Sequence, residues 1–96
     1  MRKSIYKKCD GLIVTTLEYN ETPTAIEFEW IATESQFRNK GYGSQAVREL
    51  QEYASSLNLP IIILKCEDRY IEFYKKLGFV QSDGNAKLVW LSTVRK

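Results

Sequence analysis

Residues 24–64 constrain the fold most strongly, because three segments with different hydrophobic periodicity follow one another there. Residues 24–33 alternate apolar and polar side chains, which is typical of a half-buried strand. Residues 44–57 repeat apolar side chains at helical spacing, and residues 61–64 form an unbroken apolar run, as in a strand buried on both faces. A strand, a helix and a second buried strand predict a right-handed βαβ unit that contains a parallel pair of strands.

The periodicities also predict which side chains share a face. The apolar stripe of the predicted helix consists of Ala46, Val47, Leu50, Tyr53, Ala54 and Leu57. In the strand over residues 24–33, strict alternation places Ile26, Phe28 and Trp30 on one face. The same alternation places Glu27, Glu29, Ile31 and Thr33 on the other face.

Shorter patterns on both sides extend this unit into a sheet. Strands over residues 4–8 and 12–19 flank a hairpin signal at Asp10-Gly11, and a turn follows at residues 20–23. Further on, Asp68 is expected to cap a helix that ends at Leu77, with Gly78 just beyond it. Strands over residues 79–81 and 87–94, the latter with Leu88 and Trp90 in the core, flank a turn at residues 83–85.

The predicted order is therefore β-β-β-α-β-α-β-β. It corresponds to an α+β fold whose sheet contains a parallel pair. With 96 residues, the chain has the size of one small domain, and we expect residues 1–96 to form it.

Composition excludes several classes of site. The chain has no histidine, which excludes histidine-based triads and histidine-ligated zinc, and its two cysteines cannot form a four-cysteine site, so no metal is expected. A net charge of +2 is too small to indicate nucleic acid or a membrane surface. With no signal peptide or apolar run long enough to span a bilayer, and with free thiols, we expect a cytoplasmic protein.

The segment from Arg38 to Ser44 has the composition of an anion site. Its glycines let the backbone turn tightly and approach a ligand, and its amides and the start of the following helix point at negative charge. Arg38 and Lys40 add positive charge, so a diphosphate is the natural ligand. The alternative is an ordinary loop with a glycine-containing helix start, and the spacing is neither the dinucleotide-binding nor the Walker pattern.

Two motifs resemble those of the GNAT acetyltransferases. Residues 38–43, Arg-Asn-Lys-Gly-Tyr-Gly, match the motif R/Q-x-x-G-x-G/A, and residues 73–79, Phe-Tyr-Lys-Lys-Leu-Gly-Phe, resemble the second signature of that family. The two motifs lie in the order of the family, separated by a helix and a strand. The resemblance implies a minimal GNAT fold with a mostly antiparallel sheet and a central, splayed parallel pair. This minimal fold lacks the family's usual first strand and two helices, which build one wall of the acceptor site.

The resemblance also implies acetyl-CoA as the cosubstrate. Its pantetheine arm would lie between residues 27–33 and 61–66, bonded to the backbone of Ile31, Ala32 and Thr33. Its diphosphate would rest on the loop that consists of Arg38, Asn39, Lys40, Gly41, Tyr42, Gly43 and Ser44.

Position within the motifs suggests the catalytic groups. Glu27 lies at the distance before the loop at which some lysine-directed GNAT enzymes carry a general base, and Glu29 is the alternative. Tyr74 occupies the position of the family's tyrosine and is the candidate acid for the leaving thiolate. The competing interpretations are a solvent-facing strand edge for the two glutamates and core packing for the tyrosine.

These observations predict an acetyl-CoA-dependent N-acetyltransferase that acts by direct attack in a ternary complex. Without the usual wall, the acceptor is expected to be bulky, a lysine or terminal amine of a protein, or a small amine if a homodimer supplies the wall. Glu67 and Tyr70 replace the Asn and Ala that are frequent in the family. These departures favour the alternative, a non-catalytic CoA-binding or protein-interaction module. A nucleic-acid binder ranks last.

Overall fold

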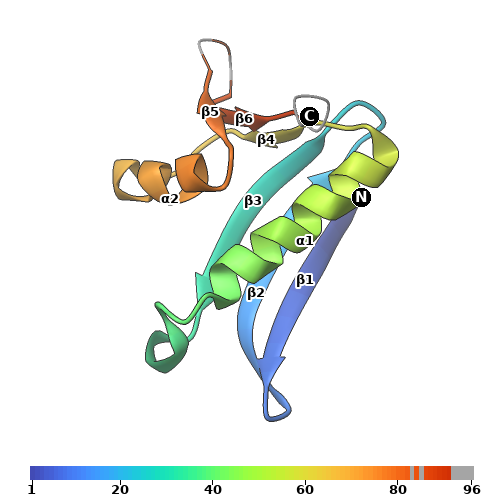
Figure 1. The fold of residues 1–96 in the computed structure, drawn as a ribbon. Coiled ribbons are helices and arrows are strands. Elements are labelled where there is room, and N and C mark those ends of the chain that lie inside the picture. Colours follow the sequence, from blue (N-terminus) through green and yellow to red (C-terminus); the bar gives the residue numbers. More distant parts are fainter. Residues whose placement is uncertain (83, 85, 92–96) are drawn as a thin grey trace.

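The computed structural model describes residues 1–82, 84 and 86–91. Within them, the chain forms a six-stranded sheet of order β1-β2-β3-β4-β6-β5 and two α-helices (Figure 1). The strands are β1 Arg2–Cys9, β2 Leu12–Glu21, β3 Ile26–Thr33, β4 Ile61–Ile63, β5 Val80–Gln81 and β6 Leu88–Trp90. The helices are α1 Tyr42–Leu57 and α2 Ile71–Lys76, with short 3-10 turns at Ser35–Phe37 and Asp68–Tyr70.

The predicted α+β architecture is confirmed. Neighbouring strands pair antiparallel except for β3 and β4, which form the predicted parallel pair around the α1 crossover. At the first hairpin, Asp10 and Gly11 both have positive φ, 51° and 83°, as a two-residue type I′ turn requires. The predicted turn at residues 83–85 and the end of the last predicted strand lie outside the described residues.

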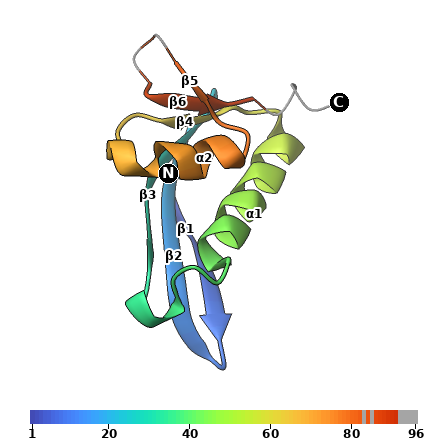
Figure 2. The ribbon, with the colours of Figure 1, turned by 60° about the vertical axis from the view of Figure 1, so that its left-hand side comes forward.

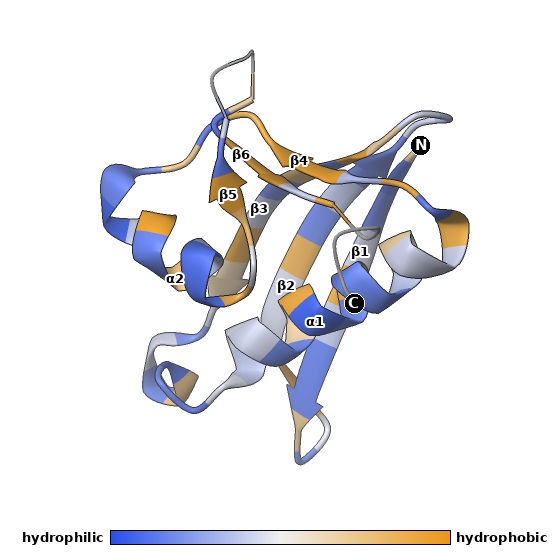
Figure 3. Cartoon of the chain, turned by 45° about the horizontal axis from the view of Figure 1, so that its top comes forward, coloured by the Kyte–Doolittle hydropathy of each residue, from blue (hydrophilic) through white to orange (hydrophobic). Residues whose placement is uncertain are grey.

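Both helices pack on one face of the sheet (Figure 2). The predicted α1 stripe supplies four fully buried side chains to the core, and Leu88 and Trp90 are buried as predicted. Figure 3 shows that β4 and β6 are largely hydrophobic, whereas the outer strand β1 is mostly hydrophilic. The core joins β1–β4 and β6 with both helices: Ile5, Leu17, Tyr19, Ile26, Phe28, Ala46, Val47, Leu50, Ala54, Ile61, Ile63, Tyr74, Phe79, Leu88 and Trp90.

A β-bulge in β3 overturns the predicted alternation. Tyr19 of β2 pairs with Phe28, but the preceding residue Glu18 pairs with Trp30, so Glu29 is the extra residue. The extra residue shifts the side-chain alternation of everything that follows it by one position. Strict alternation was therefore wrong: Ile31 and Thr33 face the helices with Phe28, and Trp30 lies on the opposite face with Glu27.

The second helix also starts differently from the prediction. Asp68 does not cap α2, because the chain first makes a 3-10 turn there and the Asp68 carboxylate accepts a hydrogen bond from Lys87 Nζ at 2.8 Å. The end of the helix is as predicted, since Gly78 has φ 99° and follows the C-cap Leu77. The Asp68 cap was therefore wrong, and the Gly78 stop is confirmed.

Candidate functional site

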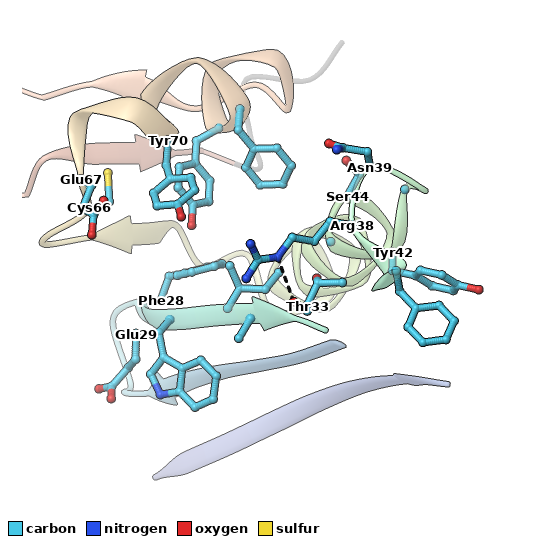
Figure 4. A pocket seen from close by; sticks show the side chains of 18 of the residues that line it. Phe28, Glu29, Thr33, Arg38, Asn39, Tyr42, Ser44, Cys66, Glu67 and Tyr70 are labelled. Carbon is cyan, nitrogen blue, oxygen red and sulfur yellow. Dashed lines mark hydrogen bonds between the residues drawn. The ribbon is translucent and has the colours of Figure 1, made fainter. Parts of the chain in front are cut away.

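A cleft of about 890 Å³ opens where β3 and β4 separate. The two strands pair at only three positions, which end at Phe28 opposite Ile63. Beyond that point residues 29–33 line one side of the cleft and residues 65–67 line the other, and the start of α1 and the helix α2 complete it. The parallel pair therefore splays, as the family resemblance implies, and the cleft lies between the two strands (Figure 4).

One end of the cleft is formed by the loop before α1. Asn39 and Gly41 have positive φ, 64° and 90°, and Gly41 is the N-cap of the helix. Within the described residues, no side chain caps this end, no acidic residue lies in the first turn, and the first helical hydrogen bond is donated by the Gln45 amide. The preceding amides of a 16-residue helix are thus available to an anion.

Close packing holds this loop against β3. A Cβ placed on Gly43 would lie 3.8 Å from Ile31 Cδ1, 3.9 Å from Thr33 Oγ1 and 3.7 Å from Phe73 Cζ, so the helix start lies near both β3 and α2. Arg38 Nε donates a hydrogen bond to the Thr33 carbonyl at 3.1 Å, which directs the guanidinium across the cleft (Figure 4). The helix start, β3 and α2 therefore meet at this end of the cleft.

All but one of the residues that the sequence predicts to bind the cosubstrate line this cleft. Lys40 is exposed and does not line it. The others do: Ile31, Ala32, Thr33, Arg38, Asn39, Gly41, Tyr42, Gly43 and Ser44.

Tyr74 lines the inner part of the cleft from α2. The side chain is only 5% exposed, and its ring makes edge contacts with Phe28, Phe73 and Phe79 at centroid distances of 5.5, 5.1 and 5.7 Å. This burial raises the pKa of the Tyr74 hydroxyl well above its ordinary value, with smaller contributions from Cys66 and Tyr70. Tyr74 is thus both a core residue and a cleft residue, and it is protonated at neutral pH.

The two predicted glutamates lie at different places. Glu27 accepts a hydrogen bond from Asn20 Nδ2 at 3.2 Å on the face of the sheet opposite the helices, and it does not line the cleft. Glu29, the bulge residue, does line the cleft, and its carboxylate forms an ion pair with Arg2 at 2.6 Å. The bulge therefore separates Glu27 from Ile31, with which the sequence placed it on one face, and only Glu29 of the two glutamates lines the cleft.

A comparison of the sequence with family models gives the same assignment as the cleft and its two motifs. Residues 6–79 match the model of the acetyltransferase (GNAT) family. The chain belongs to the GNAT family. No curated protein sequence gives a significant match.

Solved structures share the GNAT fold at low sequence identity. Tetrahymena GCN5 is 13% identical with a TM-score of 0.80, and the match covers 94% of this chain and 68% of that one. An acetyltransferase from Bacillus cereus is 20% identical with a TM-score of 0.78, covering 95% and 73%. The PaiA N-acetyltransferase from Thermoplasma acidophilum, solved in complex with coenzyme A, is 14% identical with a TM-score of 0.71, covering 92% and 58%. Family membership supports acetyl transfer as the general activity.

In this GNAT chain, the far wall of the cleft is braced by a residue that sequence reasoning missed. Lys87 Nζ donates to the Cys66 carbonyl at 2.7 Å and to Asp68 Oδ1 at 2.8 Å. These contacts fix the segment after β4, including Glu67 (Figure 4). No local pattern could reveal the brace, because Lys87 lies about twenty residues from both partners.

Three further findings limit the chemistry and the setting of the described chain. Burial raises the pKa of the Cys66 thiol, so the thiol is protonated at neutral pH and is a weak nucleophile. Among the described residues, no group of three or more acidic or cysteine side chains is placed to hold a metal ion. None of the helices in the described part of the chain is long and apolar enough to cross a membrane.

Proposed function

We propose that this GNAT domain transfers an acetyl group from acetyl-CoA to a primary amine of a polypeptide, a lysine side chain or an N-terminal amine, by direct attack in a ternary complex. One observation carries the proposal. A single cleft is lined both by an uncapped helix start and by a buried, protonated tyrosine. An elongated ligand with an anionic group and an acyl group fits this combination of features. The amide-rich loop alone would indicate only an anion.

The residues present suit acetyl-CoA, which supplies an activated acetyl thioester when bound. The free amides of the first turn of α1 and the guanidinium of Arg38 would hold its diphosphate. The backbone of residues 31–33, which borders the cleft without a pairing strand from β4, would hold its pantetheine arm. Phe28, Phe73 and Tyr74 give the cleft an aromatic lining beside its polar groups.

Glu27 is our candidate for the general base. An amine acceptor is charged at neutral pH and must lose a proton before it attacks. The Glu27 carboxylate, held by Asn20, lies on the open side of β3 at the last paired positions before the cleft, where it can take that proton directly or through a water. Glu29 is the alternative base, but its ion pair with Arg2 already engages its carboxylate.

Tyr74 is our candidate for the acid. The thiolate that leaves is basic, and its departure is easier when it receives a proton. The Tyr74 hydroxyl lines the cleft and is protonated throughout the neutral range, so it holds a proton that the thiolate can receive. Because Cys66 is protonated, the chain offers no activated thiol in this cleft, which supports direct transfer to the amine.

Three substitutions test these roles. We expect Tyr74→Phe and Glu27→Gln each to lower kcat for lysine peptides by about 100-fold or more, with free CoA thiol as the readout. Both should keep the rise in Tm that CoA produces, because Glu27 does not line the cleft and Tyr74→Phe keeps the aromatic ring that does. Glu29→Gln should change kcat by less than Glu27→Gln. Equal activity of all three variants and the wild type would contradict the assignments.

A non-catalytic module remains the second candidate, and two cleft residues favour it. Glu67 places a carboxylate and Tyr70 a large ring on the wall that faces β3. If CoA raises Tm but neither peptides nor small amines are acetylated, this GNAT domain is a CoA-binding or interaction module. Turnover of small amines alone, by a dimer in light scattering, would show instead that a second copy supplies the acceptor wall.

A further inference from the structure

The face of β1–β3 opposite the two helices carries a surface of which the proposed chemistry uses only the Glu27 side chain. We call it the open face, and within the described residues no helix covers it. Strand register and burial assign to it Arg2, Ser4, Tyr6, Lys8, Ile13, Thr16, Glu18, Asn20, Glu27, Trp30 and Ala32. Large apolar side chains are exposed there, with Tyr6 at 53%, Ile13 at 47% and Trp30 at 44%. Large apolar side chains that are exposed together on one face are a feature of interaction sites.

The open face contains a groove that adjoins the cleft. A second cavity of about 370 Å³ is lined by Ile13, Thr16, Trp30 and Ala32, with Arg38 at its edge. Trp30, Ala32 and Arg38 also line the cleft between β3 and β4. A ligand in this groove would therefore contact β3 next to the cleft.

The charges of the open face are concentrated at the end where β3 bulges. Arg2 pairs with Glu29 at 2.6 Å and lies 3.7 Å from Glu18, and Glu27 lies beside Asn20 on the same face. Two carboxylates thus share the Arg2 guanidinium, and the third, that of Glu27, is held by Asn20. The surplus of negative charge attracts a further cation, and Arg2 shows that a guanidinium fits between two of these carboxylates.

We propose that the open face binds the acceptor polypeptide, and that this polypeptide presents a basic side chain to Glu18 and Glu29 and a bulky apolar side chain to the groove beside Trp30. The inference rests on the proposed N-acetyl transfer and specifies its substrate. Charge complementarity favours this occupant over a second copy. The acidic end attracts a basic partner, and the same face of a second copy would present the same carboxylates. The acceptor amine then enters at the bulge, between Glu27 and the cleft.

Binding measurements test the inference without relying on turnover. Four fluorescently labelled peptides share one central lysine, and they carry or lack a neighbouring arginine and a neighbouring leucine. Anisotropy with CoA present gives their Kd values. We expect the peptide with both residues to bind tightest, and Glu18→Gln to weaken it about threefold to tenfold. Arg2→Gln should tighten it by a similar factor, because it releases two carboxylates, and neither variant should change the Kd of the peptide that lacks arginine.

Matched variants on the helix face serve as controls. Glu49 lies on α1 and pairs with Lys7, so Glu49→Gln removes the same charge away from the open face. Equal effects of Glu18→Gln and Glu49→Gln on the peptide with arginine would overturn the inference. So would a wild-type dimer in light scattering that Ile13→Asp converts to a monomer, since the open face would then bind a second copy.

The outcomes separate this inference from the proposed function. Acetylation of all four peptides with equal kcat/KM, and equal Kd values, would refute the docking surface and leave N-acetyl transfer in place. Arginine-dependent binding without acetylation would support the docking surface and refute the transfer.

Discussion

At the scale of single residues, Tyr74 depends on its neighbours for both its position and its charge state. Three phenylalanine rings surround it, and the same burial that packs the ring raises the pKa of its hydroxyl. Core packing and catalysis are therefore not competing interpretations of this residue. A side chain fixed by packing is a better proton donor, because its position is set before the acceptor arrives.

The raised pKa of Tyr74 has a consequence for stability at high pH. The folded state keeps the Tyr74 proton when the unfolded chain, with an ordinary pKa of about 10, has begun to lose it. The stabilisation is complete below about pH 10 and falls above it, by up to about 1.4 kcal/mol per pH unit. We expect the difference in unfolding free energy between wild type and Tyr74→Phe to shrink between about pH 9 and 11 in denaturant titrations. Parallel curves would contradict the burial argument.

Cys66 lies in the cleft, but we expect its thiol to stay unreactive. Its thiol lies in the cleft wall, but burial raises its pKa and keeps it protonated near neutral pH. We expect intact-protein mass spectrometry of the wild type, incubated with acetyl-CoA and no acceptor, to show no acetyl group on Cys66. Cys66→Ser is the control, since any adduct on this thiol would be absent from that variant. An adduct on Cys66 would indicate transfer through the thiol.

At the scale of elements, the sequence predicts strand and helix order well because each element has its own periodicity. The parallel pair, the type I′ turn and the stop at Gly78 all follow from local patterns. The bulge at Glu29 does not, because an extra residue becomes visible only in the pairing of β3 with β2. That single residue decides that Ile31 faces the helices and Trp30 the open face, so face assignments beyond it could not be predicted. The roles of Glu27 and Glu29 remain predictions.

The end of α2 explains why a Leu-Gly-Phe sequence follows the tyrosine. The Gly78 amide donates to the Lys75 carbonyl at 3.0 Å, and the Phe79 amide donates to the Tyr74 carbonyl at 3.1 Å. This is the Schellman arrangement, and its hydrophobic contact is the Phe79 ring on Tyr74. The glycine therefore stops the helix and, through Phe79, holds the tyrosine in the cleft.

Replacing Gly78 should accordingly be costly. Its φ of 99° disfavours any side chain, and a Cβ would lie 3.3 Å from the Trp90 ring. We expect Gly78→Ala to lower the free energy of unfolding by about 1–3 kcal/mol in urea titrations. Gly11→Ala is the matched control, since Gly11 also has positive φ but no atom lies within 4 Å of its added Cβ. A smaller loss for Gly78→Ala than for Gly11→Ala would contradict the packing argument.

At the scale of the whole molecule, the chain divides into two lobes along the cleft. The first lobe contains β1–β3 and α1, and the second contains β4–β6 and α2 (Figure 1). Within the one sheet, β3 and β4 are joined through three residue pairs, and β4–β6 have only two or three residues each in the described chain. Short strands with few cross-connections open locally at low free-energy cost. A ligand that contacts both walls of the cleft should therefore stabilise the second lobe most.

Hydrogen exchange with CoA tests this coupling between lobes. At a CoA concentration of about 100 times Kd, binding should stabilise the fold by about 2.7 kcal/mol, or about 10–20 °C in Tm. We expect the amides of α2 and β6 to slow more than those of β1, because the pantetheine arm would lie between β3 and the wall that carries Glu67. Adenosine 3′,5′-bisphosphate at matched occupancy is the control. It lacks the arm and should protect the start of α1 while leaving α2 nearly unchanged. Equal protection of α2 by both ligands would show that the loop end alone couples the two lobes.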